Sequence, residues 1–187
     1  MYSTAEFRKG LKIEIDGEPF VIVQAQHVKP GKGVAFVKTR IKSLDSGRVL
    51  EKTYRSGEKV KKPDFVQVSM QYLYQGDESY TFMNNQSYEQ IVVPAENMGD
   101  AKDYLKENLN VEVLIFNGRP IGIEMPNFVE LTVTYCEPGV KGDTATGATK
   151  TATLETGATV QVPLFINEGD VLRLDTRTGS YVERVNR

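Results

Sequence analysis

Residues 20–41 of the sequence read FVIVQAQHVKPGKGVAFVKTRI, and this stretch decides what fold to expect for the first part of the chain. Apolar and β-branched residues, which favour strands, lie on both sides of the central Pro30-Gly31-Lys32-Gly33. Proline fixes its own φ and lacks a backbone donor, whereas glycine permits the positive φ values that a chain reversal often requires. The stretch therefore predicts a β-hairpin with Lys32 at its outermost point and Pro30, Gly31 and Gly33 as its support.

Two simpler interpretations of the Lys32 turn stay open at this point. A Pro-Gly-Lys-Gly tetrad is ordinary turn chemistry, so Lys32 could be an incidental lysine in a solvated loop. A phosphate-binding loop is the weaker alternative, because that motif needs Gly-x-x-x-x-Gly-Lys-Ser/Thr at the start of a helix. Here Lys32 is followed by Gly33 and by the β-prone run 34–37. The rest of the chain has to decide between these interpretations.

The chain up to about Pro63 alternates in the manner of strands. Leu11, Ile13 and Ile15 would share one face, with charged residues on the other. The first predicted turn is Asp16-Gly17-Glu18-Pro19, in which the Asp-Gly pair is suited to positive φ. Further strand-like runs lie at 20–23, 34–42 and 49–54, separated by turn residues. Since the strands are short and leave no room for a helix, residues 1–63 are predicted to form a small closed or nearly closed β-barrel.

Strand signals restart in residues 64–127. Four of the expected strands lie at 65–74, 80–83, 111–116 and 119–125. Asn117-Gly118 is a strong two-residue hairpin signal, and Pro120 favours an edge strand. The one convincing helix candidate is Gly99–Leu109, with Asp100 as its N-cap. We interpret this segment as the five strands and one short helix of an oligonucleotide-binding (OB) barrel.

Residues 128–187 form a third run of strands. They are expected at 129–136, 151–154, 159–163, 171–175 and 180–185. A loop of small residues, 142–149, has the composition of a flexible connection. The segment is therefore a second candidate for a five-stranded barrel, and the fold class is predicted as all-β with three consecutive small barrels.

The charge of the chain is unevenly distributed. Residues 1–63 hold 14 lysines and arginines against 7 acidic residues, a net charge of +7. Residues 64–128 hold 3 against 10, a net charge of −7, and residues 129–187 hold 6 against 8. A basic end of this kind suggests a phosphate-bearing partner, although a solvated basic surface is the alternative.

Much enzyme chemistry is disfavoured by composition. His27 stands without a second histidine or a cysteine to hold a metal, so we expect no metal site. His27 is better suited to support the hairpin than to contact RNA. Cys136 lies in a β-run and is expected to be a structural thiol. Asp100, Asp103 and Glu107 could be imagined as a catalytic cluster, but their spacing also describes a solvated helix face.

No apolar run approaches the roughly 20 residues of a membrane span, and the first residues lack the apolar core of a secretory signal. We therefore expect a cytoplasmic protein with no membrane partner. The composition, 40% hydrophobic and 26% charged, is that of a chain that can bury a core without assistance.

Several motifs, taken together, resemble one family along the whole chain: bacterial translation elongation factor P. The most specific is Lys150-x-Ala152-x-x-x-x-Gly157-x-x-Val160-x-Val162-Pro163-x-x-Ile166-x-x-Gly169, which matches the family signature. The other matching stretches, in order and at the right spacing, are Pro30–Gly33, Tyr80–Asn84, Gly142–Thr144 and Asp175–Arg184. The lysine at the tip resembles the lysine branch of the family, whereas arginine marks another branch.

This resemblance implies an SH3-like (KOW-type) first barrel and two OB-fold barrels in an L-shaped, tRNA-like arrangement. It implies a non-catalytic elongation factor, a monomer, that binds the ribosome between the peptidyl and exit sites beside peptidyl-tRNA and relieves stalling at consecutive prolines. No cofactor is implied. A covalent extension of Lys32, such as β-lysine added by a lysyl-tRNA-synthetase-like ligase, is among the expectations.

The resemblance also assigns RNA-binding residues. Lys32 would reach towards the CCA end of peptidyl-tRNA, and the basic first domain would bind RNA through Lys29, Arg40 and Lys42. In the last domain it assigns Gly142, Asp143 and Thr144 to the exit-site codon region, and Tyr181 and Arg184 to the anticodon stem. By sequence alone Tyr181 is better explained by strand packing, and Arg40 and Arg184 could be solvated surface charges.

Three other functions compete with the elongation factor. A paralogue of elongation factor P is the nearest. A general RNA-binding module of SH3 and OB barrels would bind arbitrary single strands with comparable affinity. An enzyme is the most remote alternative.

Overall fold

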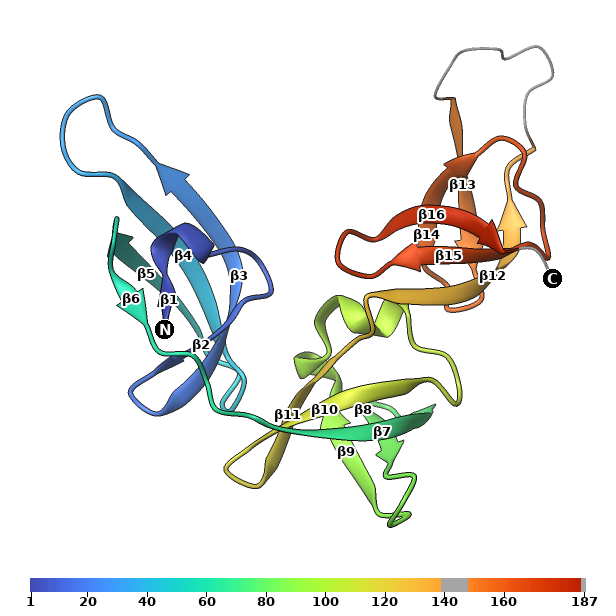
Figure 1. The fold of residues 1–187 in the computed structure, drawn as a ribbon, viewed down its shortest axis with the longest axis horizontal. Coiled ribbons are helices and arrows are strands. Elements are labelled where there is room, and N and C mark those ends of the chain that lie inside the picture. The colour runs from blue at the N-terminus through green and yellow to red at the C-terminus, as the bar shows by residue number, and fades with distance from the viewer. Residues whose placement is uncertain (139–147, 186–187) are drawn as a thin grey trace. The chain divides into compact units, whose positions relative to one another are not determined.

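A computed structural model describes residues 1–138 and 148–185, and these residues form strands connected by turns and three short 3-10 segments (Figure 1). The all-β fold class predicted from the sequence is confirmed. Most strands begin and end within two residues of their predicted bounds, and three, β14 (Thr159–Pro163), β15 (Val171–Asp175) and β16 (Ser180–Val185), match them in full.

The first sheet is antiparallel and carries the Lys32 hairpin. Its order is β2-β3-β4-β5, with bounds β2 (Lys12–Ile15), β3 (Glu18–Val28), β4 (Phe36–Ser43) and β5 (Val49–Arg55). The turn from β2 to β3 places Asp16 at φ 51° and Gly17 at φ 79°, so both central residues have the positive φ of a type I′ hairpin. A sequence of Asp-Gly is suited to this conformation, which confirms the first predicted turn.

Two strands that the sequence did not indicate accompany this sheet. β1 (Tyr2–Ser3) pairs with β6 (Lys59–Val60), and η1 (Thr4–Glu6) follows β1. An isolated bridge between Glu14 and Lys61 connects the end of this segment to β2. Strands of two residues are too short to produce a periodic pattern, because alternation needs about four residues to be recognised.

The core of the first sheet follows from alternation along its strands. In β4, Val37, Thr39 and Ile41 are buried, whereas the residues between them face outward. The inward side chains pack with residues of the other strands and of the N-terminal segment into one hydrophobic cluster, formed by Phe7, Leu11, Ile13, Phe20, Ile22, Val37, Ile41, Tyr54 and Val60. Burial of one face therefore fixes which side chains of β4 meet solvent.

The second sheet has the order β11-β10-β7-β8-β9. Its strands are β7 (Val66–Gln75), β8 (Ser79–Met83), β9 (Gln90–Pro94), β10 (Asn110–Phe116) and β11 (Arg119–Glu124). Asn117 at φ 50° and Gly118 at φ 78° form the predicted hairpin turn. Pro120 lies on β11, an edge strand, where a missing backbone donor is tolerated, and this prediction is also confirmed. β9 supplies the fifth strand.

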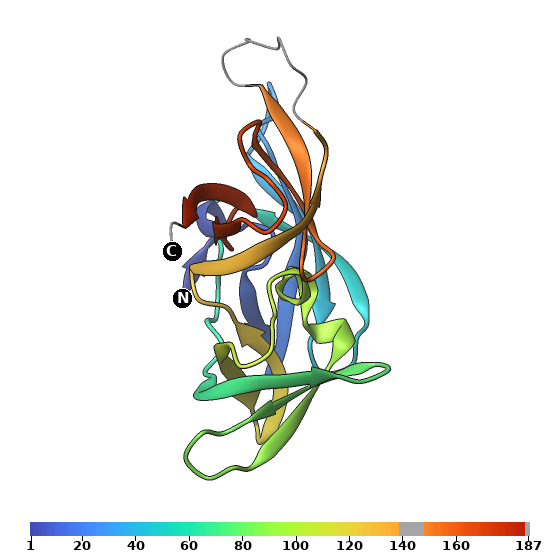
Figure 2. The same ribbon diagram turned by 90° about the vertical axis from the view of Figure 1, so that its right-hand side faces the viewer.

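The predicted helix at Gly99–Leu109 is wrong. The segment contains only η3 (Gly99–Asp103), followed by turns, and η2 (Ala95–Asn97) precedes it; the two are visible as short coils in Figure 2. The backbone N–H of Tyr104 bonds to the carbonyl of Ala101, a three-residue step, and Asp100 does not act as a cap. Asn108 then takes φ 70°, which ends any helical path. A helix this short gains too little to form without strong tertiary packing.

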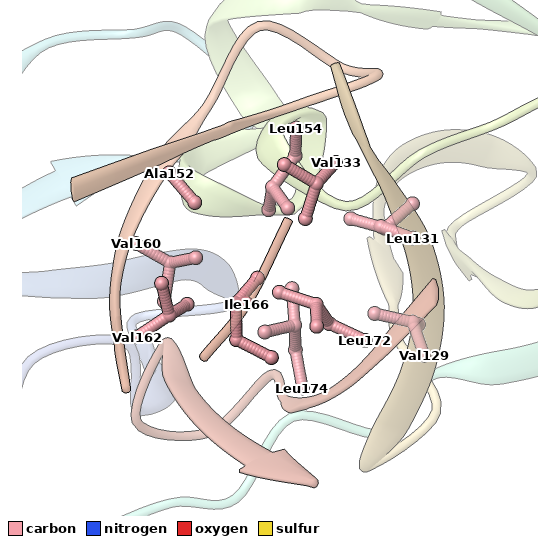
Figure 3. Packing of buried hydrophobic residues seen from close by; sticks show 10 residues of the cluster. All are labelled: Val129, Leu131, Val133, Ala152, Leu154, Val160, Val162, Ile166, Leu172 and Leu174. Atoms are coloured by element: carbon pink, nitrogen blue, oxygen red, sulfur yellow. The ribbon is translucent and has the colours of Figure 1, made fainter. Parts of the chain in front are cut away.

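The third sheet has the order β14-β13-β12-β15-β16. β12 (Phe128–Cys136) is curved (Figure 2). Its first half pairs with β15, and its second half pairs with β13 (Thr149–Leu154), with a register shift between Val133 and Tyr135. The outer strands β14 and β16 come close to each other, so the sheet closes into a barrel. Ten buried side chains point into it (Figure 3): Val129, Leu131, Val133, Ala152, Leu154, Val160, Val162, Ile166, Leu172 and Leu174.

By their contacts, the described residues divide into two units, residues 1–67 with 114–122 and residues 68–113 with 123–187. In the first unit, Leu44, Leu114 and Ile121 share one buried cluster. The predicted domain boundaries after residues 63 and 127, and the L-shaped arrangement, stay predictions. In the part of the chain that the structure describes, no helix has the length and apolar character needed to cross a membrane.

Candidate nucleic-acid interface

Lys32 lies in the loop of residues 29–35, which joins β3 to β4 and extends past the end of their sheet (Figure 1). The last pair of the ladder is Val28 with Phe36, so the loop is wider than the tight turn that the sequence suggested. Lys32 is exposed, and no ion pair or hydrogen bond joins its side chain to any residue that the structure describes. Its ammonium group is therefore available to a partner.

The glycines beside Lys32 have different roles. Gly33 takes φ 107°, a value that side chains with a Cβ rarely adopt, and thus provides the reversal. Gly31 does not use positive φ, although glycine would permit it there. A Cβ added at Gly31 would meet nothing within 4 Å, so its backbone is open to close approach by another molecule.

The hairpin is anchored at its base by His27. The imidazole Nε2 of His27 lies 3.0 Å from the carbonyl oxygen of Phe7, and because a carbonyl only accepts, Nε2 carries the proton. Phe7 is buried in the core of the first sheet. His27 therefore connects the outer half of β3 to the N-terminal segment, and the interpretation of His27 as support for the hairpin fits this contact.

A basic face follows β4 below the tip. Lys38, Arg40 and Lys42 alternate with buried residues and therefore share the outward side of the strand. Arg40 lies opposite Glu51 on β5 and opposite Gln24 on β3. A shallow cleft of about 280 Å³ over this region is lined by Gln24, Gln26, Lys38, Thr39, Arg40, Glu51, Lys52 and Thr53. Lysine and arginine side chains with amides between them are suited to contacting a phosphate backbone.

Other basic residues of this segment are occupied by ion pairs. Arg48 Nη2 lies 2.6 Å from Glu18 Oε2, and Lys61 Nζ lies 2.8 Å from Glu14 Oε2. The Ser43 hydroxyl, which donates to Glu18, together with Arg48 lowers the pKa of the Glu18 carboxyl, and the hydrogen bond to Glu14 raises the pKa of Lys61. Lys32 has no such pair among the described residues, so its charge is available to a phosphate-bearing partner.

In the last barrel the two assigned residues of β16 differ in setting. Tyr181 is partly buried and packs against the barrel core, so its contacts are those expected of a residue that serves strand packing. Arg184 is exposed: its guanidinium carbon lies 5.1 Å from the ring centre of Phe165, and its Nη1 lies 3.7 Å from Asp170 Oδ2. The predicted Gly142, Asp143 and Thr144 lie outside the described residues.

Two residues beside the assigned ones received no role from the sequence. Lys38 is a basic residue of the first barrel that shares the outward face with Arg40, as alternation along β4 indicates. Phe165 contacts Arg184, and the only sequence signal is an aromatic residue directly before the buried Ile166.

Cys136 donates weakly to the carbonyl of Ile166 at 3.5 Å, as a structural thiol would. Across residues 1–138 and 148–185, no three His, Cys, Asp or Glu side chains are arranged to hold a metal ion.

Three family models match the chain in succession. They describe the "Elongation factor P (EF-P) KOW-like domain" at residues 3–60, the "Elongation factor P (EF-P) OB domain" at 65–123 and "Elongation factor P, C-terminal" at 129–184. With an SH3-like barrel of the KOW type followed by two OB-type barrels, and with a basic loop and face on the first, the chain is a translation elongation factor.

Curated relatives identify the family. The chain is 55% identical over 184 residues to elongation factor P of Moorella thermoacetica, which covers 98% of this chain and 100% of the relative. It is 53% identical over 186 residues to elongation factor P of Bdellovibrio bacteriovorus, covering 100% and 99%. The chain belongs to the elongation factor P family.

A solved structure is also similar. Eukaryotic translation initiation factor 5A from Methanococcus jannaschii aligns with a TM-score of 0.42 at 22% identity, over 67% of this chain and 90% of that one.

Proposed function

We propose that the protein is a non-catalytic, monomeric, cytoplasmic factor that binds the ribosome between the peptidyl and exit sites and promotes peptide bond formation at consecutive prolines. Lys32 acts at the CCA end of peptidyl-tRNA. The basic face of β4 and Lys29 bind the tRNA and ribosomal RNA that surround the first domain. Arg184 binds the tRNA near its anticodon stem. The observation that carries the proposal is the exposed Lys32 ammonium at the end of the β3–β4 hairpin.

The physical account starts from proline as a substrate. Its ring fixes φ and its nitrogen is a secondary amine, so peptidyl-prolyl-tRNA and prolyl-tRNA easily miss the geometry of attack. Ordering the end of peptidyl-tRNA restores this geometry without any bond being made by the factor. A lysine ammonium has three rotatable donors on a long stem and can bind phosphate and ribose oxygens as the tRNA moves into place.

A covalent extension of Lys32 fits the same geometry. The side chain projects into solvent from the loop 29–35, and the open surroundings of Gly31 leave room for a modifying enzyme to approach. We propose a β-lysyl-type extension added by a lysyl-tRNA-synthetase-like ligase. The ε-nitrogen of Lys32 would become a neutral amide, and the two amino groups of the added β-lysine would carry positive charge further from the backbone.

The proposal is tested with a reporter that contains Pro-Pro-Pro, translated in a purified system. Wild-type protein should relieve the stall, Lys32→Ala should not, and Lys59→Ala should act like wild type, because Lys59 is an exposed lysine of the same domain on β6. Equal relief by wild type and Lys32→Ala would refute the assignment of the tip.

The modification is tested separately by intact mass. Protein from its native cell should carry an added mass that is absent from the Lys32→Arg variant and present in Lys59→Arg. If the native mass equals that of the unmodified chain, the extension is refuted while the role of the bare lysine is unaffected.

A general RNA-binding module is the alternative that the basic face of β4 favours. It predicts equal affinity for arbitrary single-stranded RNA and for ribosomes carrying peptidyl-tRNA. A marked preference for those ribosomes supports the elongation factor, and equal binding supports the module.

A further inference from the structure

Phe165 lies in the turn between β14 and β15 and is 55% exposed, whereas its neighbour Ile166 is fully buried in the core of the last barrel (Figure 3). The buried Ile166 therefore fixes the direction in which this part of the turn faces. Single exposed apolar residues are common on protein surfaces, so exposure alone gives Phe165 no role. Its contacts do.

The turn that carries Phe165 is held rigidly against β12. The backbone N–H of Gly169 donates to the carbonyl of Val133 at 2.9 Å, and the N–H of Val133 donates to the carbonyl of Asp170 at 2.9 Å. Within the turn, the Asp170 carboxylate accepts a hydrogen bond from the N–H of Asn167 at 2.8 Å. Phe165 and Asp170 are thus presented by an ordered base, not by a free loop.

Both residues contact the guanidinium of Arg184. Its Cζ lies 5.1 Å from the centre of the Phe165 ring, within cation–π range, and its Nη1 lies 3.7 Å from Asp170 Oδ2. The second distance is beyond that of a hydrogen bond, so Asp170 attracts the guanidinium without using its donors. Arg184 stays 40% exposed, and its planar set of five N–H donors is oriented before any ligand arrives.

We propose that Phe165 is a positioning residue which, together with Asp170, holds Arg184 in the orientation that binds an RNA phosphate. The inference rests on the proposed function, because it takes the RNA of the ribosomal complex as the ligand. Fixing a long side chain in advance lowers the entropy lost on binding, and arginine gains most from this because its fork matches phosphate geometry.

The test is a double-mutant cycle measured as the affinity of the full chain for ribosomes that carry peptidyl-tRNA. Arg184→Ala should weaken binding about tenfold, the effect expected for one charge-assisted hydrogen-bonded contact. Phe165→Leu should weaken binding about threefold, and Phe165→Tyr should retain wild-type affinity, because it keeps the ring. In the Arg184→Ala background, Phe165→Leu should have no further effect.

A salt titration separates positioning from simple surface burial. Arg184→Ala should reduce the slope of log affinity against log salt by about 0.7 to 0.9, the value for one phosphate contact, and Phe165→Leu should reduce it in the same direction. Tyr135→Leu is the matched control, since Tyr135 is 56% exposed on β12 in the same barrel and has no cation–π partner among the described residues. It should change neither quantity.

Two results would overturn the inference: Phe165→Leu that binds like wild type, or Phe165→Leu that weakens binding by the same factor with and without Arg184. Failure of the proposed function has a different signature, because wild-type protein itself would then show no preference for ribosomes carrying peptidyl-tRNA. Both phenylalanine variants should keep the wild-type melting temperature, since the side chain lies outside the core.

Discussion

The hydroxyl of Tyr54 is buried without a hydrogen-bond partner among the residues that the structure describes. The side chain is 3% exposed, and its ring packs edge-on against Phe7 with 5.1 Å between ring centres. Removing a buried hydroxyl that makes no hydrogen bond takes away a desolvation cost and keeps the ring contacts. Tyr54→Phe should therefore raise the free energy of unfolding by about 1 kcal/mol at pH 8.

The same burial makes the stability depend on pH. Burial is the larger cause, and the negative charge of Glu58 the smaller one, that raise the pKa of Tyr54 from 10.0 to about 12. The unfolded state then loses its phenolic proton before the folded state does, so the stability that is present below pH 10 is lost as the pH rises through 12. A tenfold difference in proton affinity is worth about 1.4 kcal/mol, so the loss approaches about 3 kcal/mol.

The assay is urea unfolding of the full chain from pH 8 to pH 12, followed by methyl NMR signals of Val37 and Val60, which lie in the same core as Tyr54. The advantage of Tyr54→Phe over wild type should start near 1 kcal/mol and grow above pH 10. Tyr135→Phe, at an exposed site, is the control and should show no such growth. A constant difference across this pH range would refute the burial of the hydroxyl, and a destabilised Tyr54→Phe at pH 8 would show that the hydroxyl has a partner.

Three further predictions concern stability. Ile166→Ala should lower the free energy of unfolding by about 3 kcal/mol in denaturant titrations, because a fully buried side chain leaves a cavity, whereas Ile166→Val should cost about 1. Asn117→Val should lower the melting temperature and Asn117→Gly should not, since φ is 50° there and a β-branched residue is strained at that value. Glu18→Gln should cost about 1 kcal/mol at pH 7; because the pKa of Glu18 is lowered in the folded state, the wild-type advantage should vanish as the pH falls through that lowered pKa.

The local signals in the sequence were sufficient for the strands and hairpins. Asn117-Gly118 and Asp16-Gly17 predicted turns that the structure contains, because type I′ geometry needs φ values that few other residues adopt. Short β-prone runs separated by turn residues placed β14, β15 and β16 at their observed bounds. In these cases the interaction that selects the structure lies within a few residues of chain.

The misses have a different origin. In the segment Gly99–Leu109 the apolar Tyr104, Leu105 and Leu109 have helical spacing. Leu105 is buried and the other two pack against the core of the last barrel, although the backbone there follows turns after a short 3-10 segment. The contact of Arg184 with Phe165 joins residues of β16 and the β14–β15 turn, and no pattern local to either segment encodes it. Long-range packing decides both, so they became visible only in the folded chain.

The exposure of Lys32 could be predicted from its glycines, but its availability could not. Whether a lysine is free or paired depends on which carboxylates the fold brings near it, as Arg48 and Lys61 demonstrate by pairing with Glu18 and Glu14. Residues of identical type in the same basic segment thus differ in what they can bind.

The central claim is that Lys32 acts on the reaction after the protein has bound. The direct measurement is the single-turnover rate of Pro–Pro bond formation on ribosomes with peptidyl-prolyl-tRNA, at saturating protein, with the affinity measured in parallel. Lys32→Ala should bind saturably and yet give the slow rate seen without the factor, whereas Lys59→Ala should give the wild-type rate. A wild-type rate for Lys32→Ala at saturation would contradict the account.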